Sequence, residues 1–306
     1  MSYRIKGVLS PVVTPFDKDL GVDLALFTAQ CRWLQANHVG LAFLGTNSEA
    51  NSIGPDERMD MIDALIQAKL DPRGMMPGTG ACDLPTVVRL TQRAVQSGCA
   101  GVLMLPPFYY KGVSDEGLYR YYSEVIQRVG DERLRIYLYH IPPVAQVPIS
   151  LGLIDRLLRA YPGIVAGVKD SSGDWSNTQA MLERFAPLGF DVFAGSETFL
   201  LQTLRHGGAG CISATANVNA AAIHALYRGW QEPGADARQQ ELDVVRQIFQ
   251  GFPMIPALKA AIAHWSRIDA WQRVRPPLVE LDDGQHAKLI RQLEAVGFSI
   301  AGLQAA

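Results

Sequence analysis

The stretch IVAGVKDSSGD at residues 164–174 decides the fold, because an apolar run typical of a buried strand ends in a lysine and breaks into a polar turn. Lys169 is therefore predicted to stand at the mouth of a strand. Apolar surroundings favour the uncharged, nucleophilic form of an amine, which makes Schiff bases with ketones. The alternative is a lysine that buries its stem and extends its charged head into water. The remaining lysines lie in sequence surroundings that we interpret as more polar or irregular: Lys6, Lys18, Lys69, Lys111, Lys259 and Lys288.

Seven further apolar runs are typical of strands, and segments with helical periodicity separate them. Pro55 followed by two acids, and Asp83 followed by Pro85, indicate helix starts. Eight alternating strand and helix units predict parallel strands that close into an α/β fold, the (β/α)8 TIM barrel. The rival is an open doubly wound sheet, but no G-x-G-x-x-G follows the first run. The predicted strands are 8–13, 41–44, 75–78, 101–105, 136–139, 164–169, 192–194 and 210–213, and the predicted helices 23–37, 55–70, 84–97, 115–129, 151–161, 176–185 and 197–206.

After about residue 220 the pattern predicts helices alone, with a clear break at 231–234. We therefore expect two parts. Residues 1–226 are predicted to form the barrel with the active site, and residues 227–306 a C-terminal helical extension that caps the barrel. The predicted helices of the second part are 221–230, 235–249, 255–265 and 284–296.

Composition excludes several classes of protein. The formal net charge is only -2 and no basic stripe occurs, which argues against nucleic acid as a partner. No apolar run reaches membrane-spanning length, and the run after the N-terminus meets Pro11 too early for a signal peptide, so we expect a soluble, cytoplasmic protein with no membrane partner. The cysteines lack CxxC spacing, which predicts neither a zinc site nor disulfides but reduced, buried residues: Cys31, Cys82, Cys99 and Cys211.

Catalytic residues of such barrels stand at the carboxyl ends of strands. Lys169 ends the sixth predicted strand, Tyr139 ends the fifth, and the turn at 45–49 follows the second, so all three are expected at one mouth. A phenol beside a cation serves as a proton shuttle for imine formation. The turn offers backbone N–H groups and short polar side chains for a carboxylate. These residues predict Schiff-base chemistry on a 2-oxo acid.

Each residue also has a plainer interpretation. Tyr139 would anchor the end of a strand through its hydroxyl, and the turn at 45–49 would be an ordinary loop. Glu49 is expected to support that loop or the next helix and not to react. His140 follows Tyr139 on a strand, so its side chain is predicted to point away from the shared cavity.

Several motifs resemble those of one superfamily. GTNSEA at 45–50 is similar to a G-[TS]-[TNS]-G-E turn, YHIP at 139–142 to Y-N-x-P, and GVKDSSGD at 167–174 to G-[VI]-K-D-[ST]-S-G-D. With SPVVTPF at 10–16 and GCISATAN at 210–217, the likeness runs through nearly the whole chain. The chain resembles the dihydrodipicolinate synthase and N-acetylneuraminate lyase superfamily of class I, Schiff-base pyruvate enzymes.

The resemblance implies a homotetramer built as a dimer of dimers. It implies that Lys169 forms the imine, that Tyr139 relays protons, that Thr46 and Asn47 hold the pyruvyl carboxylate, and that backbone around Ile212 borders the site. It further implies that a tyrosine after the fourth strand, Tyr109 or Tyr110, reaches the neighbouring subunit's site, although aromatic packing at a dimer contact explains these residues equally well. The segment with Gly195 and Glu197 resembles one that contacts distal hydroxyls in the sialate-lyase branch.

Two departures guide the choice of reaction. True synthases of the family resemble each other in an arginine shortly after the Tyr-x-x-Pro motif, where this chain has Pro143-Val144-Ala145-Gln146, and in a second threonine where it has Asn47. Ser48 also replaces the usual glycine. We expect a lyase that cleaves a 4-hydroxy-2-oxo or 2-keto-3-deoxy acid to pyruvate and an aldehyde, without metal or external cofactor. The alternatives are a keto-deoxy-sugar-acid dehydratase, a dihydrodipicolinate synthase, and a barrel that binds a ligand or regulates without catalysis.

Overall fold

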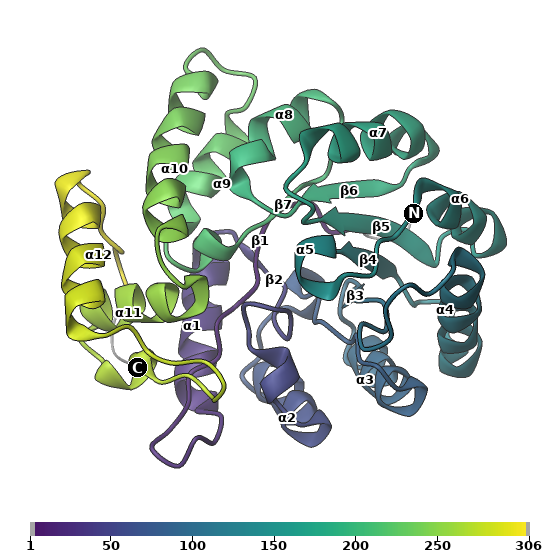
Figure 1. Cartoon of the computed structure of the whole chain (residues 1–306), viewed down its shortest axis with the longest axis horizontal. Helices are drawn as coiled ribbons and strands as arrows, with labels where there is room; N and C mark the ends of the chain where they lie inside the picture. Colours follow the sequence, from purple (N-terminus) through teal and green to yellow (C-terminus); the bar gives the residue numbers. More distant parts are fainter. Residues whose placement is uncertain (1–3, 304–306) are drawn as a thin grey trace.

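The computed structural model describes residues 4–303, which form an α/β barrel (Figure 1). Seven strands pair in parallel in the order β2-β1-β7-β6-β5-β4-β3. Almost every strand residue is buried, as expected for a parallel sheet covered by helices. The strands are β1 Gly7–Ser10, β2 Gly40–Leu41, β3 Val102–Met104, β4 Ile136–His140, β5 Val165–Asp170, β6 Asp191–Ala194 and β7 Gly210–Ile212. The outer ends of the two predicted parts, residues 1–3 and 304–306, lie outside the described residues.

Residues 75–78, the third predicted strand, complete the barrel between β2 and β3. They form isolated parallel bridges with Leu41 of β2 and with Leu103 of β3 instead of a continuous strand. Pro77 explains this difference, since it has no N–H to donate to a ladder. Its carbonyl still accepts from Leu103 N at 2.9 Å. Residues 4–303 thus pass through eight positions around the barrel, of which seven are regular strands.

Helices connect consecutive strands and cover the outside of the sheet (Figure 1). The helix starts predicted at Pro55 and Asp83 are confirmed: Pro55 opens α2, and the Asp83 side chain caps α3 by accepting from Thr86 N at 2.8 Å. Buried residues of α3 recur every three to four positions, so one face packs on the barrel. The helices are α1 Leu24–Ala36, α2 Pro55–Gln67, α3 Leu84–Gln96, α4 Asp115–Val129, α5 Pro142–Ala145, α6 Leu151–Ala160, α7 Trp175–Phe185, α8 Leu200–Arg205 and α9 Ala220–Arg228.

Beyond β7 the described residues contain helices and connecting segments but no further strand. The main helices are α9, α10 Ala235–Gln250, α11 Met254–Ser266 and α12 Asp283–Ala295. The predicted break at 231–234 lies between α9 and α10, while the expected boundary between residues 226 and 227 falls in the last turn of α9. Gln239 ties α10 to the barrel, because its amide donates to Glu197 O at 3.0 Å and accepts from Leu201 N at 3.1 Å. Helix α10 therefore lies against the segment that follows β6.

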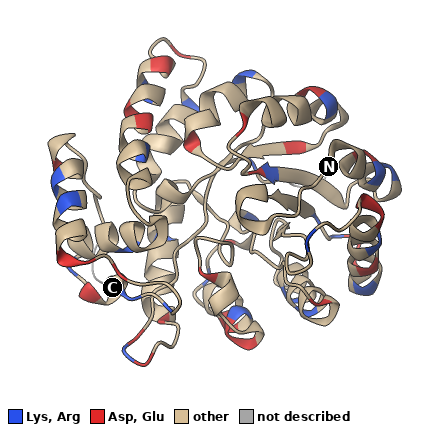
Figure 2. Cartoon of the chain, viewed as in Figure 1, with Lys and Arg blue, Asp and Glu red and all other residues tan. Residues whose placement is uncertain are grey.

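Charged residues of both signs are interspersed over the outer helices, and few lie on the strands (Figure 2). Within the described strands the charged residues are Lys169, Asp170 and Asp191. Asp191 has a structural role, since it accepts from Arg4 Nε at 2.7 Å and from the Tyr137 hydroxyl at 3.1 Å. Lys169 makes no ion pair with any described residue, so an ion pair does not explain why its amine is buried.

Candidate active site

Lys169 and Tyr139 lie side by side on neighbouring parallel strands. Tyr139 of β4 is in register with Lys169 of β5, and each is only 2% exposed. The Lys169 Nζ atom lies 4.3 Å from the centroid of the Tyr139 ring. The structure thus brings together the two residues for which sequence predicts the covalent and proton-transfer roles.

The turn after β2 reaches the same place. Thr46 Oγ1 lies 3.3 Å from the Tyr139 hydroxyl, and Asn47 lines the cavity that contains Lys169. The turn is held by its own backbone, with Ser48 N donating to Gly45 O at 3.2 Å. The hydroxyls of Thr46 and Tyr139 therefore lie within hydrogen-bonding distance of each other, and the amine of Lys169 lies over the ring of the same tyrosine.

A buried ion pair fixes the far end of this turn. Glu49 has a positive φ of 58°, and its carboxylate accepts from Lys259 Nζ of α11 and from Arg275 N at 3.0 Å. Lys259 also donates to Arg273 O at 2.7 Å. Glu49 therefore supports the loop, as predicted, and it does so by linking the turn to the C-terminal helices.

The prediction of polar or irregular surroundings for Lys259 was wrong. Its side chain is 0% exposed in a helix that is buried on almost every side. Burial lowers the pKa of Lys259 to about 8, although the nearby Glu49 carboxylate raises it. Among the described residues two lysines are therefore buried, and only Lys259 of the two has a carboxylate partner.

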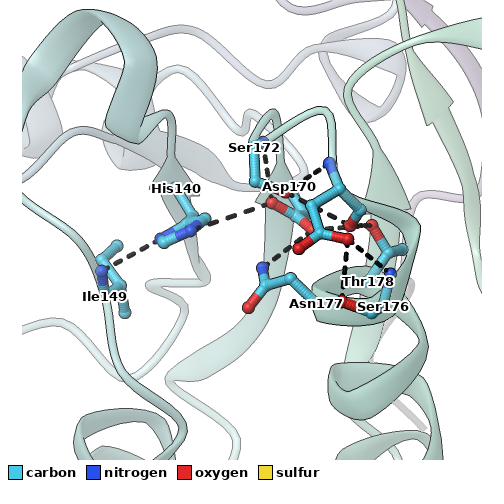
Figure 3. A network of polar contacts seen from close by, with 8 residues as sticks. His140, Ile149, Asp170, Ser172, Ser176, Asn177 and Thr178 are labelled. Atoms are coloured by element: carbon cyan, nitrogen blue, oxygen red, sulfur yellow. Dashed lines mark hydrogen bonds and ion pairs between the residues drawn. The ribbon is translucent and has the colours of Figure 1, made fainter.

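His140 and Asp170, the next residues on the two strands, belong to a polar network in which Asp170 also lines the cavity of Lys169 (Figure 3). His140 Nδ1 accepts from Ile149 N at 3.0 Å, and its Nε2 lies 4.0 Å from Asp170 Oδ1. Asp170 Oδ2 accepts from the Thr178 hydroxyl at 2.6 Å and from the Asn177 amide at 3.0 Å. Burial lowers the pKa of His140, which Asp170 opposes. His140 does not line the cavity of Lys169, so the predicted orientation is confirmed.

A cavity of about 400 Å³ opens over the carboxyl ends of the strands. Gly195 lies on its wall, where a Cβ would collide with the Ser171 hydroxyl, so glycine here leaves room for Ser171 in the cavity. The lining residues come from the ends of several strands and from two C-terminal helices; those used below are Thr46, Asn47, Tyr139, Val144, Lys169, Ser171, Gly195 and Arg246.

The C-terminal helices supply cavity residues that sequence analysis missed. Arg246 and Gln250 of α10 and Met254 of α11 all line the cavity. The Arg246 side chain is 12% exposed, and its Nη1 lies 3.5 Å from Glu197 Oε2 and 3.4 Å from Ser213 Oγ. The sequence holds no signal for these residues, because charged residues on a helix normally belong to its solvated face.

The remaining predicted site residues are more dispersed. Glu197 is 1% exposed and contacts Arg246 but does not itself line the cavity, and Ile212 is fully buried in β7. Tyr109 and Tyr110 are 75% and 71% exposed and stack edge to face, outside the cavity of their own chain. Their predicted roles stay predictions.

Within residues 4–303 there is no cluster of three or more His, Cys, Asp or Glu side chains that would hold a metal ion. All four cysteines are free, but the prediction that they are buried was wrong for Cys82, which is exposed, and only partly right for Cys99. None of the helices in the described part of the chain is both long and apolar enough to cross a membrane.

Comparison with known proteins shows which family this barrel resembles. The family model for the dihydrodipicolinate synthetase family matches residues 4–296. An uncharacterized DapA-like lyase of Chloroflexus aurantiacus is 30% identical over 294 residues, which cover 95% of this chain and 97% of the relative. The crystal structure of dihydrodipicolinate synthase from Agrobacterium tumefaciens has a TM-score of 0.88 at 30% identity, covering 95% of this chain and 99% of that one. YagE, a prophage protein of the dihydrodipicolinic acid synthase family from E. coli K12 in complex with pyruvate, has a TM-score of 0.87 at 27% identity, covering 96% and 99%.

The fold is an α/β barrel with a cavity over the carboxyl ends of its strands, where the active sites of such barrels lie. The chain belongs to the dihydrodipicolinate synthetase family, and it is a lyase of that family. The resemblance seen in the sequence motifs is therefore confirmed at the level of the family.

Proposed function

We propose that this lyase cleaves a 4-hydroxy-2-oxo or 2-keto-3-deoxy acid to pyruvate and an aldehyde through a Schiff base on Lys169. The observation that carries the proposal is the buried amine of Lys169, which faces the Tyr139 ring at 4.3 Å and has no carboxylate partner among the described residues. The likeness of the whole chain to YagE, a family member in complex with pyruvate, supports a 2-oxo acid as the substrate.

The first half of the mechanism forms the imine. The unprotonated Nζ of Lys169 attacks the C2 ketone, while Thr46 and Asn47 hold the neighbouring carboxylate. The carbinolamine then loses water as the Tyr139 hydroxyl donates a proton to the leaving oxygen, which leaves a phenolate beside a protonated imine. Thr46 Oγ1 lies 3.3 Å from the phenolic oxygen of Tyr139 and stabilises the phenolate by donating a hydrogen bond to it.

The second half breaks the carbon chain. The phenolate of Tyr139 takes the proton from the C4 hydroxyl, the C3–C4 bond breaks, and its electrons move into the protonated imine to give an enamine. The aldehyde leaves at this point. Protonation of the enamine at C3 and addition of water at C2 release pyruvate and restore the free amine of Lys169.

The choice of cleavage over synthesis depends on the wall of the cavity near α5. The family's synthases are expected to carry an arginine shortly after the Tyr-x-x-Pro motif, and here Val144 lines the cavity in that region. Val144 offers no charge to a dicarboxylate. Asn47, in place of a second threonine, cannot pass a proton as a hydroxyl does.

Product analysis tests this proposal. The protein is incubated with a panel of 4-hydroxy-2-oxo and 2-keto-3-deoxy acids, and pyruvate, aldehyde and dehydrated keto acid are quantified. We expect pyruvate and aldehyde in equal amounts. A keto acid of undiminished carbon count would instead identify a dehydratase, and rapid condensation of pyruvate with aspartate semialdehyde would identify a synthase; either result would overturn the cleavage assignment.

We also propose a homotetramer built as a dimer of dimers that works in the cytoplasm. The exposed Tyr109 and Tyr110 support a subunit contact, because aromatic residues are enriched at interfaces. Light scattering should give the mass of four chains, and cell fractionation should find the protein in the cytoplasm.

We also propose that residues 1–226 form the barrel and residues 227–306 its helical cap. Native-state hydrogen exchange tests this division. If the amides of the two parts exchange with the same free energy of opening, the parts are not separate units.

A further inference from the structure

Arg246 is a cation in the active-site cavity that the proposed mechanism does not use. It projects from α10, on a part of the chain remote in sequence from Lys169, yet both residues line one cavity of about 400 Å³. Among the described residues that line this cavity, Lys169 and Arg246 are the only lysine or arginine. The cavity therefore has a second positive group besides the one that forms the imine.

The guanidinium of Arg246 is poorly satisfied by the protein. Its Nη1 makes two long contacts, 3.5 Å to Glu197 Oε2 and 3.4 Å to Ser213 Oγ, and its buried Nε has no hydrogen-bond partner in the described chain. A guanidinium carries five N–H donors, and a buried donor without a partner is destabilising. The guanidinium therefore keeps unused hydrogen-bonding capacity, and the residue borders the cavity.

Glu197 contacts one nitrogen of the Arg246 guanidinium, Nη1, and leaves Nε without a hydrogen-bond partner in the described chain. The Glu197 carboxylate, 1% exposed, also accepts hydrogen bonds from the hydroxyls of Ser213 and Thr215. Gln239 adds a hydrogen bond from its amide to Glu197 O at 3.0 Å. The guanidinium is thus held by Glu197 and Ser213, and Arg246 also lines the cavity.

A carboxylate suits this position better than a neutral tail. The imine on Lys169 is itself cationic, and the turn with Thr46 and Asn47 takes the carboxylate next to it, so a second acid group needs a cation of its own. Hydroxyl groups would be bound by neutral side chains such as Ser171 without the cost of desolvating a guanidinium. Arg246 is planar and offers paired donors to a carboxylate.

We propose that Arg246 binds a second carboxylate at the end of the substrate remote from the C2 ketone, so that the substrate is a dicarboxylic 4-hydroxy-2-oxo acid. This inference rests on the proposed function, because it names the substrate class of the same site. It places the specificity of this lyase on α10 and not on the segment after the Tyr-x-x-Pro motif. Glu197 becomes a positioning residue for Arg246.

The experiment compares two substrates of equal carbon number, one ending in a carboxylate and one in a hydroxymethyl group, in the parent chain and in Arg246→Gln. We expect the parent to prefer the dicarboxylic acid, and Arg246→Gln to lose about a hundredfold in kcat/KM for it while changing about threefold or less for the neutral one. Arg246→Lys should recover part of the loss. Arg238→Gln is the matched control, since Arg238 lies on the same helix, pairs with the exposed Glu232 and does not line this cavity.

Trapping of pyruvate with borohydride separates the failure of this inference from the failure of the proposed function. Pyruvate has no distal group, so Arg246→Gln should trap it as the parent does, which also shows that the variant is folded. A parent that prefers the neutral substrate, or a variant that loses the same factor with both, overturns the role of Arg246 alone. Preference of the parent for a substrate that ends in a phosphate over one that ends in a carboxylate would also overturn the proposed role of Arg246. A parent that does not trap pyruvate contradicts the Schiff base itself.

Discussion

Two lysines of this chain are buried in very different ways. Lys259 in α11 is 0% exposed and donates to Glu49 and to Arg273 O, while Lys169 in β5 is 2% exposed and faces an aromatic ring and a cavity. Both side chains are removed from bulk water, so burial does not distinguish them. The partners do, because a lysine held by a carboxylate joins two parts of the fold and one without such a partner is available to attack a ketone.

Replacement of Lys169 should reduce activity, whereas replacement of Lys259 should reduce stability. The largest effect that we expect is the loss of activity at Lys169. Lys169→Arg keeps the charge but removes the nucleophile, so cleavage should fall by more than about a thousandfold. Steady-state rates measure this, with Lys288→Arg as a control for a lysine outside the cavity. Turnover as fast as the parent by Lys169→Arg would exclude the proposed mechanism.

Tyr139→Phe sharpens the comparison by testing what faces Lys169. The ring remains while the hydroxyl that meets Thr46 is lost, so kcat should fall by about 10² to 10⁴. Tyr137→Phe is the matched control on the same strand, since its hydroxyl contacts Asp191 instead. Equal kinetic losses in the two variants would argue against a proton relay at Tyr139.

Lys259→Met should affect stability. Removing one partner of a buried ion pair leaves the Glu49 carboxylate unpaired, which costs about 3–5 kcal/mol in the free energy of unfolding. Urea unfolding measures the change. The double variant Glu49→Gln with Lys259→Met should recover part of the loss, because it leaves no unpaired buried charge; no recovery would show that the ion pair is not the source.

The pH dependence of stability gives the smallest expected effect. The pKa of Lys259 is lowered to about 8 in the folded chain from 10.5, so the unfolded state binds more protons between these values. The stability of the parent relative to Lys259→Met should therefore rise from pH 8 toward pH 10.5 and be lower below pH 8. Urea midpoints of both proteins across this range test the sign, and a difference that falls with pH would contradict it.

The sequence predicts the part of the site that depends on strand order. Lys169 and Tyr139 end adjacent strands, and parallel register alone brings them together. The same rule places the turn with Thr46 at the same mouth. The third strand was less predictable, because Pro77 leaves only isolated bridges where the apolar pattern indicates a strand.

The C-terminal side of the site was not predictable in this way. Arg246 and Lys259 lie on helices whose packing against the barrel depends on tertiary contacts such as those of Gln239, which the sequence pattern does not encode. A helix that is buried all round, such as α11, also hides a charged residue among apolar ones without any break in its pattern. The lysine that we propose as the nucleophile was therefore visible in the sequence, and the arginine that we propose to determine specificity was not.

Borohydride reduction with pyruvate, followed by mass mapping of peptides, tests the central difference between the two lysines in a single sample. The account predicts a reduced pyruvyl adduct on Lys169 and none on Lys259, although both amines are buried. An adduct on Lys259, or an unmodified Lys169 under conditions that trap a known family member, would contradict it.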